Sequence, residues 1–355
     1  MILHVQKVSG ISGSEAHLLS LLPGLRERGL DARFVMLHEG EPGAAEFASA
    51  LAERQVPLQQ IRMRADVDPL AFVRLLALLR RQRPQLVHTH LFHADVYGLA
   101  AAALARVPLR ASTKHGFNEF RARASFAALD RAVFRLAHLH IAISRGLARY
   151  LAETEGLPEE RFEVVHYGIA PGPEPPGEDG APSLLCIARL VPIKGHETLF
   201  EAFRRARAQV PELTLDVAGE GPLESELRAA APEGVRFLGR VSPPQEAIER
   251  HAVVVVPSLG EGFGMAALEA QERGRSVIAS AVGGLPEIVA DGETGLIVPP
   301  GEPGPLAEAI VRLARDPELR WRLGAAGRAR ALAEFSAVRC AERTAALYAA
   351  AGDVL

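Results

Sequence analysis

Residues 253–270 read VVVVPSLGEGFGMAALEA, and this segment is the most informative one about the fold class. Four consecutive valines predict a strand that is buried on both faces, as in a parallel sheet covered by helices. Gly262 and Gly264 follow in a loop where the backbone can approach a ligand closely, and a helix is expected to begin near Met265. The free N–H groups and positive dipole end of that helix would point at the same place. The pattern is typical of a strand, a ligand-binding loop and a helix in an α/β domain.

Two carboxylates accompany this loop. Glu261 lies within it, and Glu269 is expected about one turn inside the helix. Because they are eight positions apart, they can reach different parts of one ligand, and a carboxylate suits a vicinal diol, which offers it two donors. A glycine turn that caps an ordinary helix, with Glu269 exposed, would give the same spacing. The flanking glycines and the preceding strand favour a binding site.

Strand-like runs alternate with amphipathic helical stretches along the whole chain, which indicates βαβ units and parallel sheets. The runs in the first half are 2–8, 32–37, two near Leu86 and Leu109, 139–143 and 162–165, and those in the second half are 183–188, 213–218, 235–238, 253–256, 276–279 and 295–298. The segment APGPEPPGEDGAP, 170–182, is typical of a linker. Since 355 residues exceed the usual size of a single core, we predict an N-terminal domain 1–169, a C-terminal domain 183–335 and a separate last helical segment 336–355.

Cations occur after another strand of the second half. In ARLVPIKG, 188–195, Arg189 follows a strand-like run and Lys194 precedes a helix. Both side chains can converge on one diphosphate, whose charge grows when it leaves a sugar. Two unrelated surface charges are the alternative. The tight turn AGEGPLESEL, 218–227, is the third loop of this kind.

The order of these motifs resembles a known family. ARLVPIKG, VAGEGP, FLGRV, PSLGEGFGMAALEA and AVGGLPEIVADGETGLIVPP resemble the C-terminal domain of retaining glycosyltransferases of family 4, and SGISGSEAHLLSLLPGLRERG, 9–29, resembles their first loop and helix. The resemblance implies an α/β protein of the GT-B fold, in which two Rossmann-like domains with parallel sheets face each other across a cleft. It also implies that the last helix crosses back to the N-terminal domain.

The resemblance assigns roles to particular residues. Arg189 and Lys194 would hold the diphosphate, Glu269 the ribose hydroxyls, and Glu261 the donor sugar near its reacting centre. Further donor contacts would come from Gly13, Arg240, Val241, Gly262, Phe263, Gly264 and Met265. His115 in ASTKHGF matches the family's histidine beside the sugar or acceptor; a satisfied structural histidine is the alternative.

Acceptor-side contacts are expected from Ser14, Glu15, His93 and Asp95. The first loop reads GISGSE where many relatives have a tighter GGxE arrangement, so the resemblance carries over less directly there. His88, His90 and His93 suggest a metal site, but Asp95 alone would complete the ligand set. We therefore expect neither a metal nor a cofactor, as the family implies.

The predicted activity is transfer of a hexosyl-type sugar, with retained anomeric configuration, from a nucleoside diphosphate donor to an acceptor hydroxyl. A UDP-sugar is the favoured donor; the acceptor is a glycan, a lipid-linked molecule or a small molecule of polysaccharide or glycoconjugate biosynthesis. The alternatives are another GT-B enzyme, namely a sugar phosphorylase or a nucleotide-sugar epimerase, and a catalytically silent nucleotide-sugar-binding partner.

Composition narrows the partners and the location. The net charge of −3 argues against nucleic acid as a partner. Cys186 and Cys340 stand apart with no metal-ligand spacing, the N-terminus lacks a signal peptide, and the apolar runs are short, so we expect a cytoplasmic protein. Residues 1–170 hold 21 Lys and Arg against 17 Asp and Glu, and phenylalanines and arginines mix in 116–140. These features make the N-terminal domain a candidate for peripheral contact with the inner membrane face, with core packing of the phenylalanines as the alternative.

Overall fold

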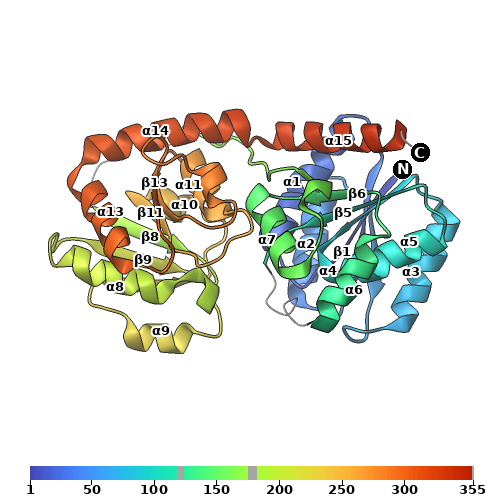
Figure 1. The fold of residues 1–355 in the computed structure, drawn as a ribbon, viewed down its shortest axis with the longest axis horizontal. Coiled ribbons are helices and arrows are strands. Elements are labelled where there is room, and N and C mark those ends of the chain that lie inside the picture. Colours follow the sequence, from blue (N-terminus) through green and yellow to red (C-terminus); the bar gives the residue numbers. More distant parts are fainter. Residues whose placement is uncertain (118–123, 175–181, 354–355) are drawn as a thin grey trace. The chain divides into compact units, whose positions relative to one another are not determined.

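The computed structural model describes residues 1–117, 124–174 and 182–353. Its chain divides into two compact units. Unit 1 comprises Met1–Gly168 and Ala337–Leu355, and unit 2 comprises Ile169–Ser336 (Figure 1). Part of the predicted linker, 175–181, lies outside the described residues. Where the chain enters and leaves unit 2, the backbone N–H of Ile169 donates to the carbonyl of Phe335 at 2.8 Å.

Unit 1 is built on a parallel sheet of seven strands in the order β3-β2-β1-β4-β5-β6-β7. Its strands are β1 (Ile2–Lys7), β2 (Ala32–His38), β3 (Leu58–Arg62), β4 (Leu86–His90), β5 (Leu109–Lys114), β6 (Leu139–Ala142) and β7 (Phe162–Val164). Its helices are α1 (Gly13–Glu27), α2 (Pro42–Glu53), α3 (Pro69–Gln82), α4 (Leu91–Ala94), α5 (Ala100–Leu104), α6 (Ala124–Phe134), α7 (Arg145–Glu155) and α15 (Ala337–Asp353), with a π-helical turn η1 (Asp95–Leu99) and a 3-10 turn η3 (Glu159–Arg161).

Helices cover both faces of this sheet. One apolar core joins the sheet to α1, α2 and α15, and another joins it to α3, η1 and α5. The last helix packs closely on α1, because a Cβ added at Gly24 would lie 2.9 Å from Cβ of Ala341. Local signals set the ends of α1: Ser12 and Glu15 form a capping box at its start, and Gly29 (φ +80°) follows its end.

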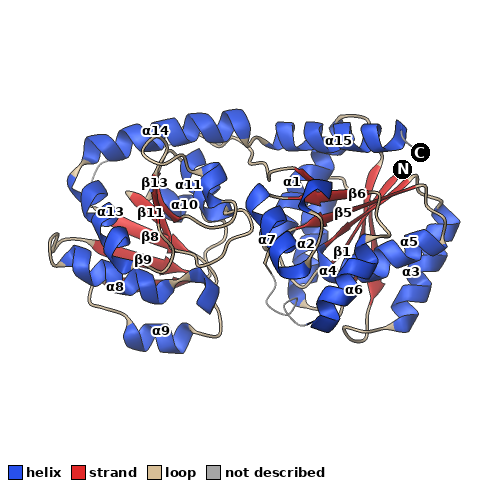
Figure 2. Cartoon of the chain, in the orientation of Figure 1, coloured by secondary structure: helices blue, strands red, loops and turns tan. Residues whose placement is uncertain are grey.

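Unit 2 contains a parallel sheet of six strands in the order β10-β9-β8-β11-β12-β13. The strands are β8 (Ser183–Ile187), β9 (Thr214–Ala218), β10 (Val235–Gly239), β11 (Val253–Val256), β12 (Ser276–Ser280) and β13 (Leu296–Val298). The helices are α8 (His196–Arg207), α9 (Glu224–Ala230), α10 (Gln245–Glu249), α11 (Met265–Glu272), α12 (Leu285–Ile288), α13 (Pro303–Arg315) and α14 (Pro317–Glu334), with a 3-10 turn η4 (Pro192–Lys194). All four valines of β11 are buried, as the sequence predicts. In Figure 2 the strands of each unit lie among its helices.

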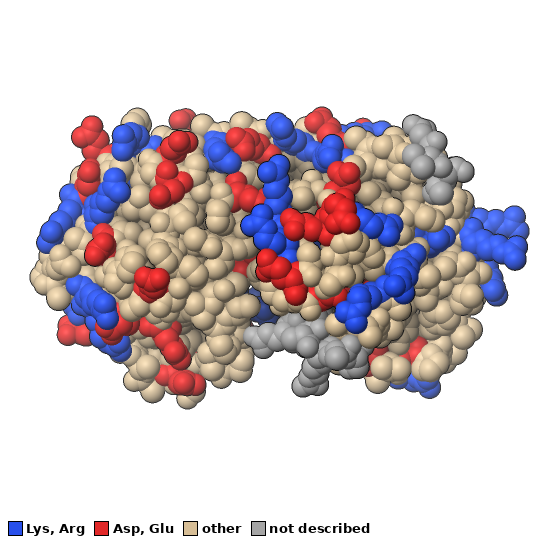
Figure 3. Space-filling view, in the orientation of Figure 1, with Lys and Arg blue, Asp and Glu red and all other residues tan. Residues whose placement is uncertain are grey.

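The α/β class with two parallel, Rossmann-like sheets is therefore confirmed. Among the described residues, none of the helices combines the length and apolar composition that crossing a membrane requires. Positive and negative side chains are interspersed on the face seen in Figure 3.

Candidate functional site in unit 2

The two central strands of unit 2, β8 and β11, form a topological switch point. From β8 the chain continues to β9 and β10 on one side, whereas β11 leads to β12 and β13 on the other. Ligands of doubly wound sheets bind beyond the carboxyl ends of the strands at such a point. The loops that follow β8 and β11 contact each other there: the N–H of Leu259 donates to the carbonyl of Ile193 at 2.8 Å. Gly195 (φ +68°) permits this contact, since a Cβ there would lie 2.1 Å from the carbonyl oxygen of Pro257.

An ion pair joins the two loops. Nζ of Lys194 lies 2.6 Å from Oε2 of Glu261, and the two side chains are 17% and 16% exposed. The hydroxyl of Ser258 donates to the same carboxylate oxygen at 3.3 Å. The structure thus brings together two residues that the sequence places 67 positions apart, and it neutralises their charges against each other.

The glycine turn between β11 and α11 can hold no other residue at one position. Gly264 has φ +113°, and a Cβ there would lie 2.5 Å from Cδ2 of Leu285. Gly262 and Phe263 are buried beside it. Helix α11 begins at Met265, as predicted, and directs its first N–H groups beyond the carboxyl end of β11.

Glu269 lies in α11 and is half-buried. Among the described residues its carboxylate has no hydrogen-bond or ion-pair partner. Burial, and secondarily the charge of Glu272, raise its pKa to about 7. Glu269 is therefore not exposed, as the alternative of a glycine turn on an ordinary helix had required. A carboxylate that is partly desolvated without a partner is suited to accept hydrogen bonds from a ligand.

Two arginines lie at the same edge of the sheet. Arg189 follows β8 and Arg240 follows β10, and both are exposed. In the described part of the chain neither side chain forms a hydrogen bond or an ion pair. Val241, next to Arg240, is half-buried. The predicted donor residues of unit 2 thus lie in the segments that follow β8, β10 and β11 at the carboxyl ends of the strands, with Glu269 inside helix α11.

The predicted residues of unit 1 divide into exposed and buried groups. Gly13 is the first residue of α1 and is exposed, with no atom within 4 Å of an added Cβ. Ser14 and Glu15 are 8% and 4% exposed. Oε2 of Glu15 accepts from the N–H of Ser12 and the hydroxyl of Ser14, each at 3.1 Å, and its Oε1 accepts from Gln6. Glu15 is therefore occupied with capping α1, and this geometry gives no support to its acceptor contact.

Asp95 is fully buried, contrary to the expectation of an acceptor ligand. It accepts from the hydroxyls of Thr89 at 2.5 Å and Ser112 at 2.8 Å, and from Nζ of Lys114 at 2.8 Å. A buried charge needs such partners, so Asp95 serves the packing of η1 on the sheet. His93, by contrast, is 40% exposed, with Nε2 3.4 Å from the carboxylate of Asp66.

His115 follows β5 and is half-buried. Its Nδ1 lies 2.5 Å from the hydroxyl of Tyr167, and its Nε2 lies 2.8 Å from Nδ1 of His90. Sequence reasoning missed two residues of this neighbourhood, His4 and Tyr167. His4 could not be placed there from the sequence, because the register that pairs it with His88 cannot be obtained from one strand.

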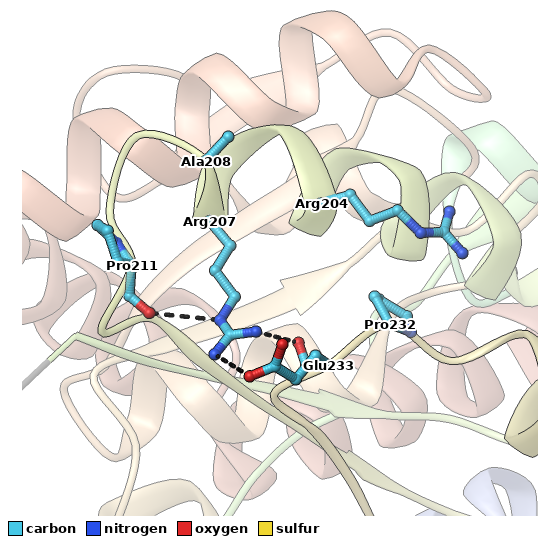
Figure 4. A pocket seen from close by; sticks show the side chains of 6 residues that line it. All are labelled: Arg204, Arg207, Ala208, Pro211, Pro232 and Glu233. Carbon is cyan, nitrogen blue, oxygen red and sulfur yellow. Dashed lines mark hydrogen bonds and ion pairs between the residues drawn. The ribbon is translucent and has the colours of Figure 1, made fainter.

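A separate hollow lies at the other end of α8 from Lys194. Figure 4 shows its lining by Arg204, Arg207, Ala208, Pro211, Pro232 and Glu233. Arg207 donates to the carbonyls of Pro211 and Glu233, and Arg204 donates to the carbonyl of Ala230. These arginines are thus occupied by backbone acceptors, and the hollow provides no chemistry comparable to that of the switch point.

Comparisons with known proteins match the family that the sequence motifs resemble. A family model described as Glycosyltransferase Family 4 matches residues 11–172, and one described as Glycosyl transferases group 1 matches residues 181–316. The chain is 37% identical over 171 residues to a GDP-mannose-dependent monoacylated alpha-(1-6)-phosphatidylinositol monomannoside mannosyltransferase of Corynebacterium glutamicum, a match that covers 44% of each chain. It is 41% identical over 165 residues to a D-inositol 3-phosphate glycosyltransferase of Frankia alni, which covers 41% of this chain and 40% of the relative. The chain thus matches less than half the length of both curated relatives.

A solved structure resembles the chain over nearly its full length. Anabaena HepE, in complex with UDP and glucose, superposes with a TM-score of 0.81 at 20% identity, over 98% of this chain and 99% of the other. At this level of identity the likeness concerns the fold.

Proposed function

Because the chain belongs to glycosyltransferase family 4 and has the GT-B fold, we propose that it moves a sugar from a nucleoside diphosphate donor to an acceptor hydroxyl, with retention of configuration. The observation that carries the proposal is the Lys194–Glu261 ion pair, which joins the loops after β8 and β11 at the switch point of unit 2. The exposed Arg189 lies on the first of these loops, and the half-buried Glu269 lies in the helix that follows the second.

The donor-binding roles follow from the chemistry of these groups. Arg189 and Lys194 would hold the diphosphate, because both are cations on the loop after β8. Glu269 would accept the two ribose hydroxyls, which supply the hydrogen bonds that its carboxylate lacks in the free protein. Glu261 would contact the sugar. The backbone from Gly262 to Met265 would approach the sugar and phosphate, and Arg240 and Val241 would lie beside the base.

The reaction would require charge stabilisation more than a protein nucleophile. As the glycosidic bond breaks, negative charge gathers on the leaving diphosphate, and Arg189 and Lys194 would be fixed cations for it. The leaving phosphate would itself help to deprotonate the acceptor hydroxyl on the same face of the sugar. In the free protein Lys194 is neutralised by Glu261, so donor phosphate would compete with a carboxylate for this lysine. Catalysis would then depend most on Arg189, Lys194, Glu261 and His115, with Gly13 as a donor contact from α1.

The identity of the donor's base and sugar has to be determined by measurement. A UDP-sugar is our first candidate, and GDP-mannose is the competing one because it is named for the 37% identical relative. We propose no metal or cofactor for either donor.

The acceptor is proposed to be lipid-linked, with unit 1 in peripheral contact with an anionic membrane. The segment first considered for this contact, 116–140, is partly core: Phe134 is 4% exposed and stacks on His140 with ring centroids 3.5 Å apart, while residues 118–123 lie outside the described residues. A better surface lies on α3 and the loop before it. Val67, Leu70 and Val73 are 81%, 41% and 55% exposed there. Exposed arginines accompany them, namely Arg64, Arg74, Arg80 and Arg81. Apolar and basic side chains on one face suit the interface of an anionic bilayer.

The test is release of nucleoside diphosphate from UDP-, GDP- and ADP-sugars, with and without polyisoprenyl- or inositol-containing lipids as acceptors. One donor class should be consumed, faster with acceptor, and proton NMR of the product should show the donor's anomeric configuration. Lys194→Ala should abolish turnover, whereas Arg204→Ala, at the other end of the same helix, should not. Absence of turnover with every donor would contradict the proposal.

Two rival activities on the same fold separate in this assay. A phosphorylase would require inorganic phosphate for turnover, and an epimerase would convert the donor sugar without any acceptor. A catalytically silent binding protein would bind one nucleotide and turn over none.

A further inference from the structure

A chain of histidines crosses the switch point of unit 1, between β1 and β4. His4 lies on β1 and His88 and His90 lie on β4, and all three are at most 1% exposed. Parallel pairing places His4 beside His88, and the rings of His4 and His90 lie nearly parallel, at 11°. His115, which follows β5 and is half-buried, extends this series of histidines away from the core.

The hydrogen bonds connect three of these imidazoles in one line. Nδ1 of His4 lies 2.9 Å from Nε2 of His90, and Nδ1 of His90 lies 2.8 Å from Nε2 of His115. Nδ1 of His115 then meets the hydroxyl of Tyr167 at 2.5 Å. His88 stands outside the line, because Tyr348 and Thr113 take its two nitrogens at 2.5 and 2.6 Å.

A metal ion is the obvious rival explanation. His4, His88 and His90 place one nitrogen each within 4.8 Å of one another. However, every ring nitrogen of these three residues except Nε2 of His4 already has a hydrogen-bond partner. The described ligand set also contains no carboxylate or thiolate to offset a divalent charge in this buried place. The hydrogen bonds account for the histidines without a metal.

His4, at the buried end of the line, determines which nitrogen donates in each hydrogen bond of the line. Burial lowers the pKa of His4 to about 3 and that of His90 well below its usual range, so each ring is neutral and carries one proton. Nε2 of His4 is buried without a partner. An orphaned buried N–H is rarer than an orphaned acceptor, so His4 should carry its proton on Nδ1. His4 then donates to His90, His90 donates to His115, and His115 donates to Tyr167.

We propose that His90 and His4 are positioning residues that hold His115 in the Nδ1–H tautomer, with its Nε2 accepting from His90, before any substrate binds. A ring nitrogen's protonation is set by the hydrogen bond that the other nitrogen makes. A histidine side chain that is free in water prefers the Nε2–H form. The line of histidines therefore imposes the less common tautomer on His115. The consequence for turnover rests on the role proposed above for His115, whereas the tautomer itself does not.

The direct test is long-range nitrogen–proton NMR of the histidine rings in the full-length protein without ligand. Wild type should show His115 as Nδ1–H. His90→Phe should return it to Nε2–H, and His90→Asn, whose amide nitrogen replaces Nδ1 as donor, should preserve Nδ1–H. His88→Phe is the matched control, because it changes an equally buried ring outside the line and should leave His115 unchanged. An Nε2–H form of His115 in wild type would overturn the proposal, as would stoichiometric zinc in the purified protein.

Kinetics provide the second readout. His90→Phe should lower kcat about tenfold at an unchanged KM for the donor, and His90→Asn should restore most of it. Equal losses in both variants would indicate a merely structural role and overturn the positioning role. If wild type shows the predicted tautomer but no turnover with any donor, the proposed function fails and the tautomer assignment stands.

Discussion

At the scale of single residues, the Lys194–Glu261 pair is the most informative contact. Glu261→Gln removes the carboxylate that holds Lys194, so a nucleoside diphosphate should bind at least as tightly as in wild type. Turnover should nevertheless fall about 100-fold, since the contact with the reacting sugar is lost. Calorimetry with the nucleotide and initial rates separate the two effects. Glu201→Gln, which breaks an exposed pair with Arg205 on α8, is the control and should change neither. Weaker nucleotide binding in Glu261→Gln would contradict this account.

Glu269 gives a residue-scale prediction that depends on pH. Its pKa of about 7 in the fold exceeds the ordinary value of 4.5, so the folded state favours the neutral carboxyl. The contribution of the neutral carboxyl to the free energy of unfolding is present below pH 4.5 and is lost as the pH rises through 7. Glu269→Gln should therefore match wild type in free energy of unfolding near pH 4.5 and exceed it by about 2 kcal/mol at pH 8. Urea unfolding at the two pH values measures this difference, and equal stabilities at pH 8 would refute it.

The substitution Glu269→Gln should also weaken binding of the donor. An ionised Glu269 accepts two hydroxyl hydrogen bonds, whereas the glutamine offers one acceptor oxygen. Nucleotide affinity of wild type should rise between pH 6 and pH 8, and that of Glu269→Gln should not. A parallel pH dependence in the two proteins would remove Glu269 from the nucleotide contacts.

At the scale of elements, two glycines at helix N-termini differ in what they tolerate. Gly264→Ala places a Cβ 2.5 Å from Leu285 at φ +113°, so it should lower stability by roughly 1–3 kcal/mol and abolish nucleotide binding. Gly13→Ala meets open space and should leave the melting temperature unchanged. If Gly13 approaches the donor as proposed, its alanine variant should lose activity while it stays folded. Full activity of Gly13→Ala would exclude that contact.

The histidines of β1, α1 and β4 should make unit 1 sensitive to acid. Burial lowers the pKa of His4 and His17 to about 3, and that of His88 well below its usual range. In the unfolded chain they titrate near 6.5, so that state takes up more protons as the pH falls below 6.5. Each of these histidines should lower the free energy of unfolding by up to about 1.4 kcal/mol for each pH unit below 6.5. Urea midpoints at pH 7, 6 and 5 should fall less steeply for His88→Gln than for wild type. Parallel curves would contradict the prediction.

The elements themselves could largely be predicted from local pattern. The valines of β11 and the Ser12–Glu15 capping box are local signals, and the structure has a strand and a helix start at those places. Strand β3 was missed, because LQQIR contains only two apolar residues and lies at the edge of its sheet. An edge strand buries few side chains, so its pattern is weak.

At the scale of the whole molecule, the predicted membrane contact depends on the α3 surface. Liposomes rich in phosphatidylglycerol should co-sediment the protein, and phosphatidylcholine liposomes should not. Replacing Val67 and Val73 by serine should release it, whereas Val338→Ser, at an α15 valine about as exposed as Val73, should not. Binding that is unaffected by the α3 changes would place the contact elsewhere.

The candidate site was predictable where a motif carried its chemistry and not where long-range packing decided. Sequence motifs predict the glycine turn and the residues Glu261 and Lys194. The ion pair between Lys194 and Glu261 could not be predicted, because it depends on the neighbouring positions of β8 and β11 in the sheet. Glu15, from the first loop, and Asp95, from VHTHLFHAD, are predicted as acceptor-side residues. Their burial and their partners, Gln6 and Lys114, follow from strand pairing that a single sequence does not specify.

We propose that the switch point of unit 2 binds a nucleoside diphosphate sugar. This proposal can be tested by calorimetric titration of the protein with UDP, GDP and ADP, repeated with Lys194→Ala and with Arg204→Ala. We expect one-to-one binding of one nucleotide, lost in Lys194→Ala and unchanged in Arg204→Ala. Equal binding by the wild type and Lys194→Ala, or no binding of any nucleotide, would contradict it.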